Sequence, residues 1–516
     1  MKKYRSLLIL SVIVLAAFLR LYGLGSLGMG FFRDEAAIGY NIFSILKTGR
    51  DEFGQLLPVI FRSFEVFFLP AYFYLSVPIM AILRLSPFST RLLSAIAGVV
   101  AVYLIYLLAK KIIPAKKCFP LAAALLLAVS PWHLFFSRGA FEGNLALTFF
   151  AAGVYFFVNF LDGKERHLTY SLVLFTLSMY SYQSERLVVP LWLFICALIY
   201  RKKFLLFGWR KLFIFSLPAL AVGLPLLFIW LSPAGLHRAA GVSLFSENAN
   251  FSGGVLRKIA AMYVSYFSPK NLFWLGDYDL ERSLVGMSVF FFWLVPGFFI
   301  GLYRLRAPWL WAWLLLAPLP ASLTPDPFHT YRSLLIYFPL TIFIAYGWTE
   351  ILSRFRKLLP IVFGFLLFSL VQLATSYLYV TPYERAYYWD QPFKQTVEAI
   401  NKYAPTAEKV VVDTSYSEPY IHYLFWSKYD PKKLQGQSLK LDYYGSSERI
   451  RYDHIDNIYF ENVDWPTRRG DSGTIFVVPH TEVPPSEFIT DPKVKLLDTT
   501  YFPNGEAAFR LLLILK

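Results

Sequence analysis

Long apolar segments separated by short polar loops run through the first three quarters of the chain. They recur from Ser6 to about Tyr379, and most are long enough to cross a hydrocarbon core of about 30 Å as helices. A helix also satisfies its backbone hydrogen bonds internally, as a membrane requires. The pattern predicts eleven membrane-spanning helices, at residues 6–22, 90–110, 119–136, 143–161, 169–183, 187–201, 212–231, 286–303, 307–322, 331–350 and 358–380.

One further apolar segment, Val66–Arg84, is nearly long enough to span the membrane. Pro70 and Pro78 interrupt it, and helix-breaking residues at membrane depth are tolerated best in protein-packed or re-entrant segments. Counting it as a crossing would also reverse the side of every later loop. We therefore predict an interfacial or re-entrant helix within an outer loop at residues 23–89, while an arrangement of twelve or thirteen spans stays open.

The hydrophobic pattern changes after residue 381. Gln391–Tyr403 has apolar residues at helical spacing with Asp390 as the expected cap, and Lys409–Asp413 is a short β-branched run. Ser417–Tyr429 is expected to form an aromatic helix. Alternating helices and strands predict a small α/β domain in this part of the chain. Its further strands are expected at residues 457–460, 474–478, 494–498 and 508–514.

The charge divides the chain at the same place. Residues 1–381 carry 34 Lys and Arg against 15 Asp and Glu, whereas residues 382–516 carry 16 against 19. A pI near 9.5 often indicates nucleic-acid binding. Here the positive charge is better explained by basic loops that face anionic lipid. A mean hydropathy of +0.48 excludes a soluble multidomain protein. We predict a membrane domain at residues 1–381 and an α/β domain at residues 382–516.

Basic residues cluster in the short loops and indicate the orientation, because cytoplasmic loops carry an excess of Lys and Arg. With all clusters inside, the N-terminus is cytoplasmic and the α/β domain lies outside. We therefore predict a multi-pass protein of the cytoplasmic membrane. The clusters are Lys2/Lys3/Arg5, Lys110/Lys111/Lys116/Lys117, Lys164/Arg166, Arg201/Lys202/Lys203/Arg210/Lys211, Arg304/Arg306 and Arg354/Arg356/Lys357.

Ionisable residues of both signs gather at the outer face of this topology, whereas the inner loops are short and mostly basic. A site that contains both carboxylates and guanidiniums is therefore expected at the outer face of the membrane. The outer loop at residues 232–285 is too long for a simple connector, and long loops tend to carry function. The outer-face residues are Asp34, Glu35, Glu65, Arg91, Arg138, Glu142, Glu185, Arg186, Asp277, His329 and Arg332.

An acidic pair, Asp34-Glu35, stands directly after the first predicted span within Phe32–Ala36. A carboxylate loses hydration near hydrocarbon, so ionisable residues in this position indicate a functional site. The alternative is that both carboxylates are solvated charges at the membrane interface.

Four short motifs stand in order along the membrane part of the chain: Asp34-Glu35-Ala36, Arg91-Leu92-Leu93-Ser94-Ala95, Ser130-Pro131 with Ser137-Arg138, and His329-Thr330-Tyr331-Arg332. Taken in order, these motifs give the chain a pattern that resembles the GT-C membrane glycosyltransferases. More narrowly, it is similar to their protein O-mannosyltransferase and ArnT-like branch, glycosyltransferase family 39. The resemblance covers most of residues 1–380 as a pattern. It departs at Phe67-Phe68-Leu69-Pro70, where the family commonly has Lys-Pro-Pro with the lysine near the donor phosphate.

The resemblance implies a GT-C fold and an enzyme that moves a monosaccharide from a polyprenyl-phosphate carrier to an acceptor hydroxyl at the outer face. Asp34 is the expected general base of an inverting displacement. Glu35 is expected to orient Asp34, to bind acceptor or to cap the following helix. The expected partners are the lipid-linked donor, membrane lipids and a hydroxyl acceptor on a protein, lipid or glycan, with no nucleic acid.

Negative charge develops on the leaving phosphate, and fixed guanidiniums stabilise it through their planar fork. Because the family's lysine is absent, phosphate binding is expected to fall to other cations. The alternative for each arginine is snorkelling or pairing with a nearby acid. The expected donor-phosphate ligands are Arg186, Arg332, Arg138 and His329, and the expected acceptor or sugar ligands are Glu142, Asp277 and Tyr182.

No cofactor is expected to be required. A divalent cation is conceivable at Asp34, Glu35 and Asp277, because some GT-C enzymes use one, but the branch resembled here generally does not. Two other functions stay open. A polymerase or ligase that uses lipid-diphosphate glycans does not explain the acidic pair. A lipid-linked sugar transporter is disfavoured because we find no internal repeat and the ionisable residues gather at one face.

Overall fold

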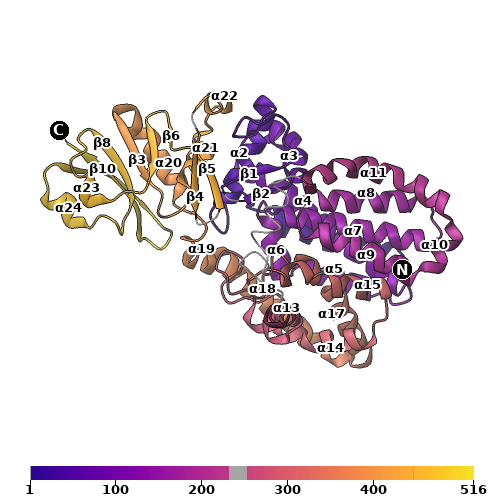
Figure 1. Ribbon diagram of the computed structural model, residues 1–516. Helices are drawn as coiled ribbons and strands as arrows, with labels where there is room; N and C mark the ends of the chain where they lie inside the picture. The colour runs from indigo at the N-terminus through magenta and orange to yellow at the C-terminus, as the bar shows by residue number, and fades with distance from the viewer. Residues whose placement is uncertain (1, 65, 232–252, 438, 445–446, 516) are drawn as a thin grey trace. The chain divides into compact units, whose positions relative to one another are not determined.

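The computed structural model describes the chain except for residues 1, 65, 232–252, 438, 445–446 and 516 (Figure 1). Glu65 and the first part of the predicted outer loop at 232–285 therefore lie outside the described residues. The chain divides into two compact units, each built from several of its stretches. The first unit contains Met1–Leu24, Leu69–Tyr72 and Arg91–Ala374, and the second contains Gly25–Phe68, Phe73–Thr90 and Thr375–Lys516.

Among the described residues, all the regular secondary structure of the first unit is helical. Most of its helices are apolar, and polar turns separate them. In chain order they are α1 (Lys2–Leu21), α4 (Pro87–Ile112, which begins in the second unit), α5 (Phe119–Ala128), α6 (Pro131–Arg138), α7 (Glu142–Leu161), α8 (His167–Met179), α9 (Glu185–Ile199), α10 (Arg201–Phe207), α11 (Trp209–Leu231), α13 (Gly253–Ser265), η1 (Asn271–Leu275), η2 (Phe292–Leu294), α14 (Val295–Arg304), α15 (Pro308–Leu316), α16 (Leu319–Ser322), α17 (Leu334–Arg354), η3 (Arg356–Leu358) and α18 (Leu359–Thr375).

Each of the eleven predicted spans lies on one helix or on consecutive helices. The prediction of a polytopic helical membrane protein is therefore confirmed. Among the described residues, five helices are long and apolar enough to cross a membrane, or six if the bent pair α5 and α6 forms one span. The others are shorter or interrupted. The five are Pro87–Ile112, Glu142–Leu161, Trp209–Leu227, Leu334–Arg354 and the continuous run Arg356–Glu384.

The span predicted at 119–136 is broken by a bend of 54° between α5 and α6. Pro131 begins α6 and cannot donate a backbone hydrogen bond, and Ser130 before it is extended. The last carbonyls of α5 are therefore left without helical partners. The buried guanidinium of Arg20 donates to two of them, at 3.3 Å to Leu127 O and 3.1 Å to Ala128 O.

Helices α14 and α17 pack backbone against backbone. A Cβ added at Gly347 would lie 2.0 Å from the carbonyl oxygen of Gly297, and one at Gly301 would lie 2.0 Å from that of Phe343. Small residues that allow such close approach are typical of helix pairs in membranes. This pair places α17 firmly in the first unit, and α17 follows directly after the His329–Arg332 motif.

The second unit combines segments near residues 25–90 with the C-terminal part of the chain. We predicted one division of the chain at residues 381 and 382, whereas the compact units interleave. Its elements are α2 (Arg33–Thr48), β1 (Phe61–Ser63), β2 (Val66–Phe68), α3 (Pro70–Leu83, which begins in the first unit), η4 (Ser376–Val380), α19 (Thr381–Glu384), α20 (Phe393–Tyr403), η5 (Ala404–Thr406), β3 (Lys409–Asp413), α21 (Pro419–Ser427), α22 (Pro431–Leu434), β4 (Lys440–Tyr444), β5 (Ser447–Arg451), β6 (His454–Ile455), β7 (Ile458–Glu461), α23 (Trp465–Arg468), β8 (Thr474–Pro479), α24 (Pro485–Thr490), β9 (Val494–Tyr501) and β10 (Ala507–Ile514).

A six-stranded sheet with the order β6-β7-β3-β8-β10-β9 organises the C-terminal part of this unit (Figure 1). Strand β3 is parallel to β7 and β8, and the remaining pairs are antiparallel. Val411 of β3 and Phe476 of β8 are fully buried in its core. The predicted small α/β domain is therefore confirmed, and every predicted strand is present. The hairpin β4–β5 was not predicted, because its mixed polar sequence contains no apolar run.

Candidate active site

Helix α2 begins at the acidic pair and gives its two carboxylates different surroundings. Glu35 is buried, and its carboxylate accepts a hydrogen bond from the amide of Phe32 at 3.3 Å. Phe32 is the residue before the helix, so Glu35 stabilises the helix start in the manner of a capping box. Asp34 is partly exposed. Of the two carboxylates, Asp34 is therefore the one that solvent or a substrate can reach.

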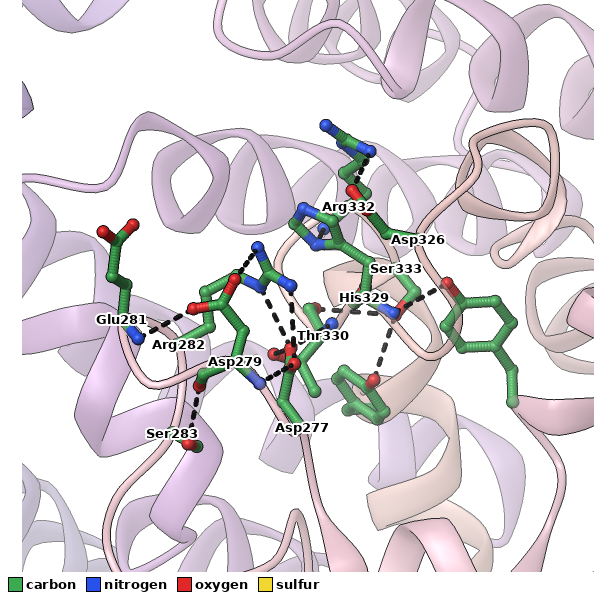
Figure 2. Close-up of polar contacts among 12 residues, drawn as sticks. Asp277, Asp279, Glu281, Arg282, Ser283, Asp326, His329, Thr330, Arg332 and Ser333 are labelled. Carbon is green, nitrogen blue, oxygen red and sulfur yellow. Dashed lines mark hydrogen bonds and ion pairs between the residues drawn. The ribbon is translucent and has the colours of Figure 1, made fainter. Parts of the chain in front are cut away.

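The segment His329–Ser333 is the centre of the polar network in the first unit (Figure 2). Its five residues contact different neighbours within that unit. The amide of His329 donates to Tyr266 Oη at 3.0 Å, and the hydroxyl of Ser333 lies 2.9 Å from that of Tyr337. Thr330, Tyr331 and Arg332 each reach a further element. The predicted His-x-x-Arg motif is thus a junction where several helices and loops meet.

Asp277 fixes this segment through hydrogen bonds from Thr330 (Figure 2). Its Oδ2 accepts from the amide of Thr330 at 2.9 Å and from the hydroxyl of Thr330 at 2.6 Å. Arg282 pairs with Asp277 at 3.1 Å and with Asp279 at 2.7 Å. The two aspartates raise the pKa of Arg282, so its guanidinium stays charged despite burial. We predicted Asp277 as an acceptor or sugar ligand, and its carboxylate is engaged by these partners within the protein.

Arg332 occupies the exposed side of the segment. Its guanidinium pairs with Asp326 at 2.9 Å, and the two side chains are 26% and 39% exposed. An ion pair that is this exposed contributes little stability and exchanges partners readily. Arg332 can therefore turn from Asp326 to a bound anion at small cost, as a phosphate ligand requires.

His329 is buried beside two guanidiniums. Its Nδ1 accepts a hydrogen bond from the amide of Arg332 at 3.2 Å, which leaves the ring proton on Nε2. Burial, together with the charges of Arg332 and Arg282, lowers the pKa of His329 to about 2. The imidazole is therefore neutral at physiological pH. Any contact of His329 with a phosphate would be a hydrogen bond and not an ion pair.

Tyr331 connects the polar network to residues at the start of α7 and just before α9. Its hydroxyl accepts from the amide of Gly143 at 3.0 Å, and its ring lies 4.9 Å from that of Tyr182. The carboxylate of Glu142 hydrogen-bonds Tyr331. Glu142 and Tyr182, both predicted to bind acceptor or sugar, are thus brought together around one tyrosine.

The two remaining predicted phosphate ligands differ in their positions. Arg186 lies in the first turn of α9, two residues after Ser184, whose hydroxyl donates to the carbonyl of Arg332 at 3.1 Å. The start of α9 therefore contacts the segment that carries Arg332. Arg138 is buried, and its guanidinium donates to Leu19 O at 2.7 Å and to Tyr22 O at 3.0 Å. These bonds satisfy carbonyls at the end of α1, which is a structural use of this arginine.

A small cavity of about 30 Å³ lies beside Asp277. It has room for about one water molecule and none for a sugar ring. It joins the Ser130–Arg138 motif to the Asp277 network. Its lining includes Trp132, Phe135 and Phe136 of α6 with Asp277, Arg282 and Thr330.

Several residues of this site were not predicted from the sequence. Arg282 and Asp279 belong to the charged run Asp277–Arg282, which stands out in an aromatic loop and could have indicated the network. Asp326 lies six residues before its partner Arg332, but nothing in the sequence around it indicated that pair. Tyr331 belongs to the predicted His-x-x-Arg motif, but its contact with Gly143 was not predicted, because the two residues are distant in sequence. Asp34 and Glu35 belong to the second unit and the other predicted ligands to the first. Within the described ranges, no three His, Cys, Asp or Glu side chains are grouped to hold a metal ion.

Residues 69–232 match the model of the dolichyl-phosphate-mannose-protein mannosyltransferase family. No curated protein sequence matches the chain. The fold is similar to that of ArnT from Cupriavidus metallidurans. The apo structure aligns with a TM-score of 0.54 at 10% identity, over 98% of this chain and 97% of ArnT. The structure bound to undecaprenyl phosphate aligns with a TM-score of 0.57 at 11% identity over the same shares.

Proposed function

We propose that this chain is a GT-C membrane glycosyltransferase of the protein O-mannosyltransferase and ArnT-like branch, and that it moves a monosaccharide from a polyprenyl-phosphate carrier to an acceptor hydroxyl. The match to the mannosyltransferase family model and the similarity to the ArnT fold support this proposal. The acceptor oxygen bonds to the anomeric carbon as the bond from that carbon to the phosphate oxygen breaks, which inverts the configuration. Asp34 takes the hydroxyl proton, and the carrier phosphate leaves with the electron pair. The reaction takes place at the outer face of the cytoplasmic membrane, with the N-terminus inside.

The geometry of Arg332 is the observation that carries the proposal. Asp277 and Ser184 fix the neighbouring backbone, while the guanidinium itself is partly exposed on an ion pair with Asp326. A fixed backbone with an available planar fork suits a leaving phosphate, whose charge grows in the transition state. The donor class is further supported by the ArnT structure that contains undecaprenyl phosphate.

The remaining predicted residues have roles consistent with their surroundings. Arg186 joins Arg332 in binding phosphate, and neutral His329 contributes a hydrogen bond. Glu142 and Tyr182, which meet at Tyr331, contact sugar or acceptor hydroxyls. Glu35 acts on Asp34 through the helix start that it caps. The reaction needs no metal or other cofactor in this proposal, so transfer is expected to persist after chelation with EDTA.

Incubation of membranes with a panel of radiolabelled polyprenyl-phosphate sugars tests the proposal. One label is expected to leave its carrier and appear in a product that survives mild acid, which cleaves the carrier bond. Membranes that contain the Asp34→Asn protein provide the matched control. If no monophosphate donor loses its sugar while a diphosphate-linked glycan does, the polymerase or ligase function replaces this one. Movement of intact donor across the membrane without a covalent product would identify a transporter.

A further inference from the structure

The start of α2 is held by a residue that lies 357 positions away in sequence. The amide of Arg33, the first residue of α2, donates to Oδ2 of Asp390 at 2.8 Å. This amide is among the four at a helix start that have no helical partner. Both residues belong to the second unit. A carboxylate there satisfies the donor and also interacts favourably with the positive end of the helix dipole.

Asp390 is specialised for this contact. We predicted it as the cap of the helix that follows it, but α20 begins after Pro392, and the carboxylate of Asp390 points to α2 instead. Its φ angle is +50°, which is uncommon for a residue other than glycine. Such a backbone conformation costs free energy and persists only where the surrounding structure imposes it.

The surroundings of Asp390 fix its carboxylate. The side chain is 2% exposed, and the Nε2 atom of the fully buried His422 lies 3.3 Å from Oδ2. The ring of His422 stacks on that of Phe393 at 4.2 Å, so it cannot turn away freely. The chain before α2 also packs closely against the backbone next to Asp390. A Cβ added at Gly30 would lie 2.2 Å from the carbonyl oxygen of Trp389, so only glycine fits there.

We propose that Asp390 is a positioning residue for the general base, in that its carboxylate fixes the first turn of α2 and thereby the direction of Asp34. Asp34 follows Arg33 directly, so a shift of the Arg33 amide moves the reacting carboxylate with it. The inference rests on the proposed role of Asp34. It gives the C-terminal α/β fold a part in transfer.

Three variants of the full-length protein in detergent test this inference. Asp390→Gly removes the acceptor without strain, because glycine adopts a φ of +50° freely. Asp390→Asn keeps an acceptor oxygen, and asparagine tolerates the same conformation. Asp491→Ala is the matched control, because the carboxylate of Asp491 accepts from the nearby amide of Lys493 within the same unit. The readouts are kcat and KM for the donor, and hydrogen exchange of the Arg33 amide.

Asp390→Gly is expected to lower kcat by about 10- to 100-fold with KM for the donor nearly unchanged, since a displacement of about 1 Å costs that much. The Arg33 amide is expected to exchange faster. Asp390→Asn should restore both readouts to within about threefold of wild type, because an acceptor oxygen still bonds the Arg33 amide. Asp491→Ala should match wild type in both readouts.

Unchanged exchange of the Arg33 amide in Asp390→Gly would overturn the inference, whatever happens to transfer. A loss in Asp390→Asn as large as in Asp390→Gly would also overturn it, because charge and not the acceptor would then matter. Faster exchange with normal kcat would reject the link to catalysis. The proposed function itself fails separately, if Asp34→Asn transfers sugar at the wild-type rate.

Discussion

Two adjacent carboxylates at the start of α2 illustrate how residues of the same type come to have different surroundings. Glu35 is turned inward to the amide of Phe32, and Asp34 remains partly exposed. A general base needs to reach its proton, which only the second of these surroundings permits. The structural contact of Glu35 therefore supports the proposal that Asp34, and not Glu35, is the base.

Asp34→Asn is expected to lower turnover by about 10²–10⁴-fold while donor binding persists, because the amide keeps the size of the side chain but cannot accept the proton. Single-turnover transfer with purified protein measures the change. Glu35→Gln should have a milder effect, because an amide oxygen still accepts from Phe32. Wild-type turnover in Asp34→Asn with intact donor binding would reject the mechanism.

Arg332→Ala is expected to weaken donor binding strongly, since the guanidinium fork is the proposed phosphate ligand. Arg332→Lys should recover only part of the affinity, because a lysine offers a point charge without the bidentate fork. Equilibrium binding of a lipid-phosphate sugar is the measurement. Arg354→Ala, at the exposed far end of α17, is the control for loss of positive charge. Equal donor affinity in Arg332→Ala and wild type would exclude this assignment.

At the scale of elements, the breaks in the helices have identifiable causes. The bend between α5 and α6 follows from Pro131, and Arg20 satisfies carbonyls that the break exposes. Such breaks are tolerated at membrane depth only where the protein itself supplies the missing partners. Because α5 and α6 occupy one predicted span, the break does not change the predicted side of later loops.

The orientation of the helices can be tested with a native cysteine. Cys118 is exposed in the basic loop between α4 and α5, and Cys196 is buried. A membrane-impermeant maleimide is expected to label Cys118 only after cells are permeabilised, because basic loops face the cytoplasm. In a Cys118→Ser background, a Glu506→Cys reporter should be labelled in intact cells. Labelling of Cys118 from outside would mean that Val66–Arg84 crosses the membrane.

At the scale of the molecule, the acidic-pair helix forms part of the same compact unit as the C-terminal sheet. The side-chain amide of Gln435 in that unit donates to Ser44 Oγ, Thr48 Oγ1 and Asp51 O. The fully buried Glu52 accepts from the amide group of Asn41 at 2.9 Å, and its carbonyl accepts from Tyr452 at 2.7 Å. These polar contacts bind α2 to residues more than 380 positions away.

Glu52 makes the stability of this unit depend on pH. Burial raises the pKa of Glu52 to about 8 from its ordinary 4.5, with a smaller contribution from Asp51. The folded state therefore holds a proton that the unfolded state releases between about pH 4.5 and 8, and the free energy of unfolding falls as pH rises through that range. Glu52→Gln is expected to remove this fall, which hydrogen exchange of α2 across the pH range measures. Glu482 is exposed, and Glu482→Gln is the control. If Glu482→Gln removes the pH dependence of stability as completely as Glu52→Gln does, Glu52 is not the source of that dependence.

Much of this protein follows from local sequence. The eleven apolar segments, the strands of the α/β domain and the His329–Arg332 motif all lie where periodicity and residue type predicted them. These features depend on contacts between near neighbours, such as helical hydrogen bonds and the burial of an apolar face. The predicted polar residues Arg332, His329 and Asp277 also meet in one network, because polar groups between apolar helices have few partners other than one another.

Only the tertiary structure decided which partner each polar group has. Asp390 caps α2 and not its own helix, and Arg138 satisfies the end of α1. A carboxylate or guanidinium accepts many partners of similar strength, and the choice depends on which elements the packing brings within about 3 Å. That choice involves residues hundreds of positions apart, as with Arg33 and Asp390, and no spacing along the chain encodes it.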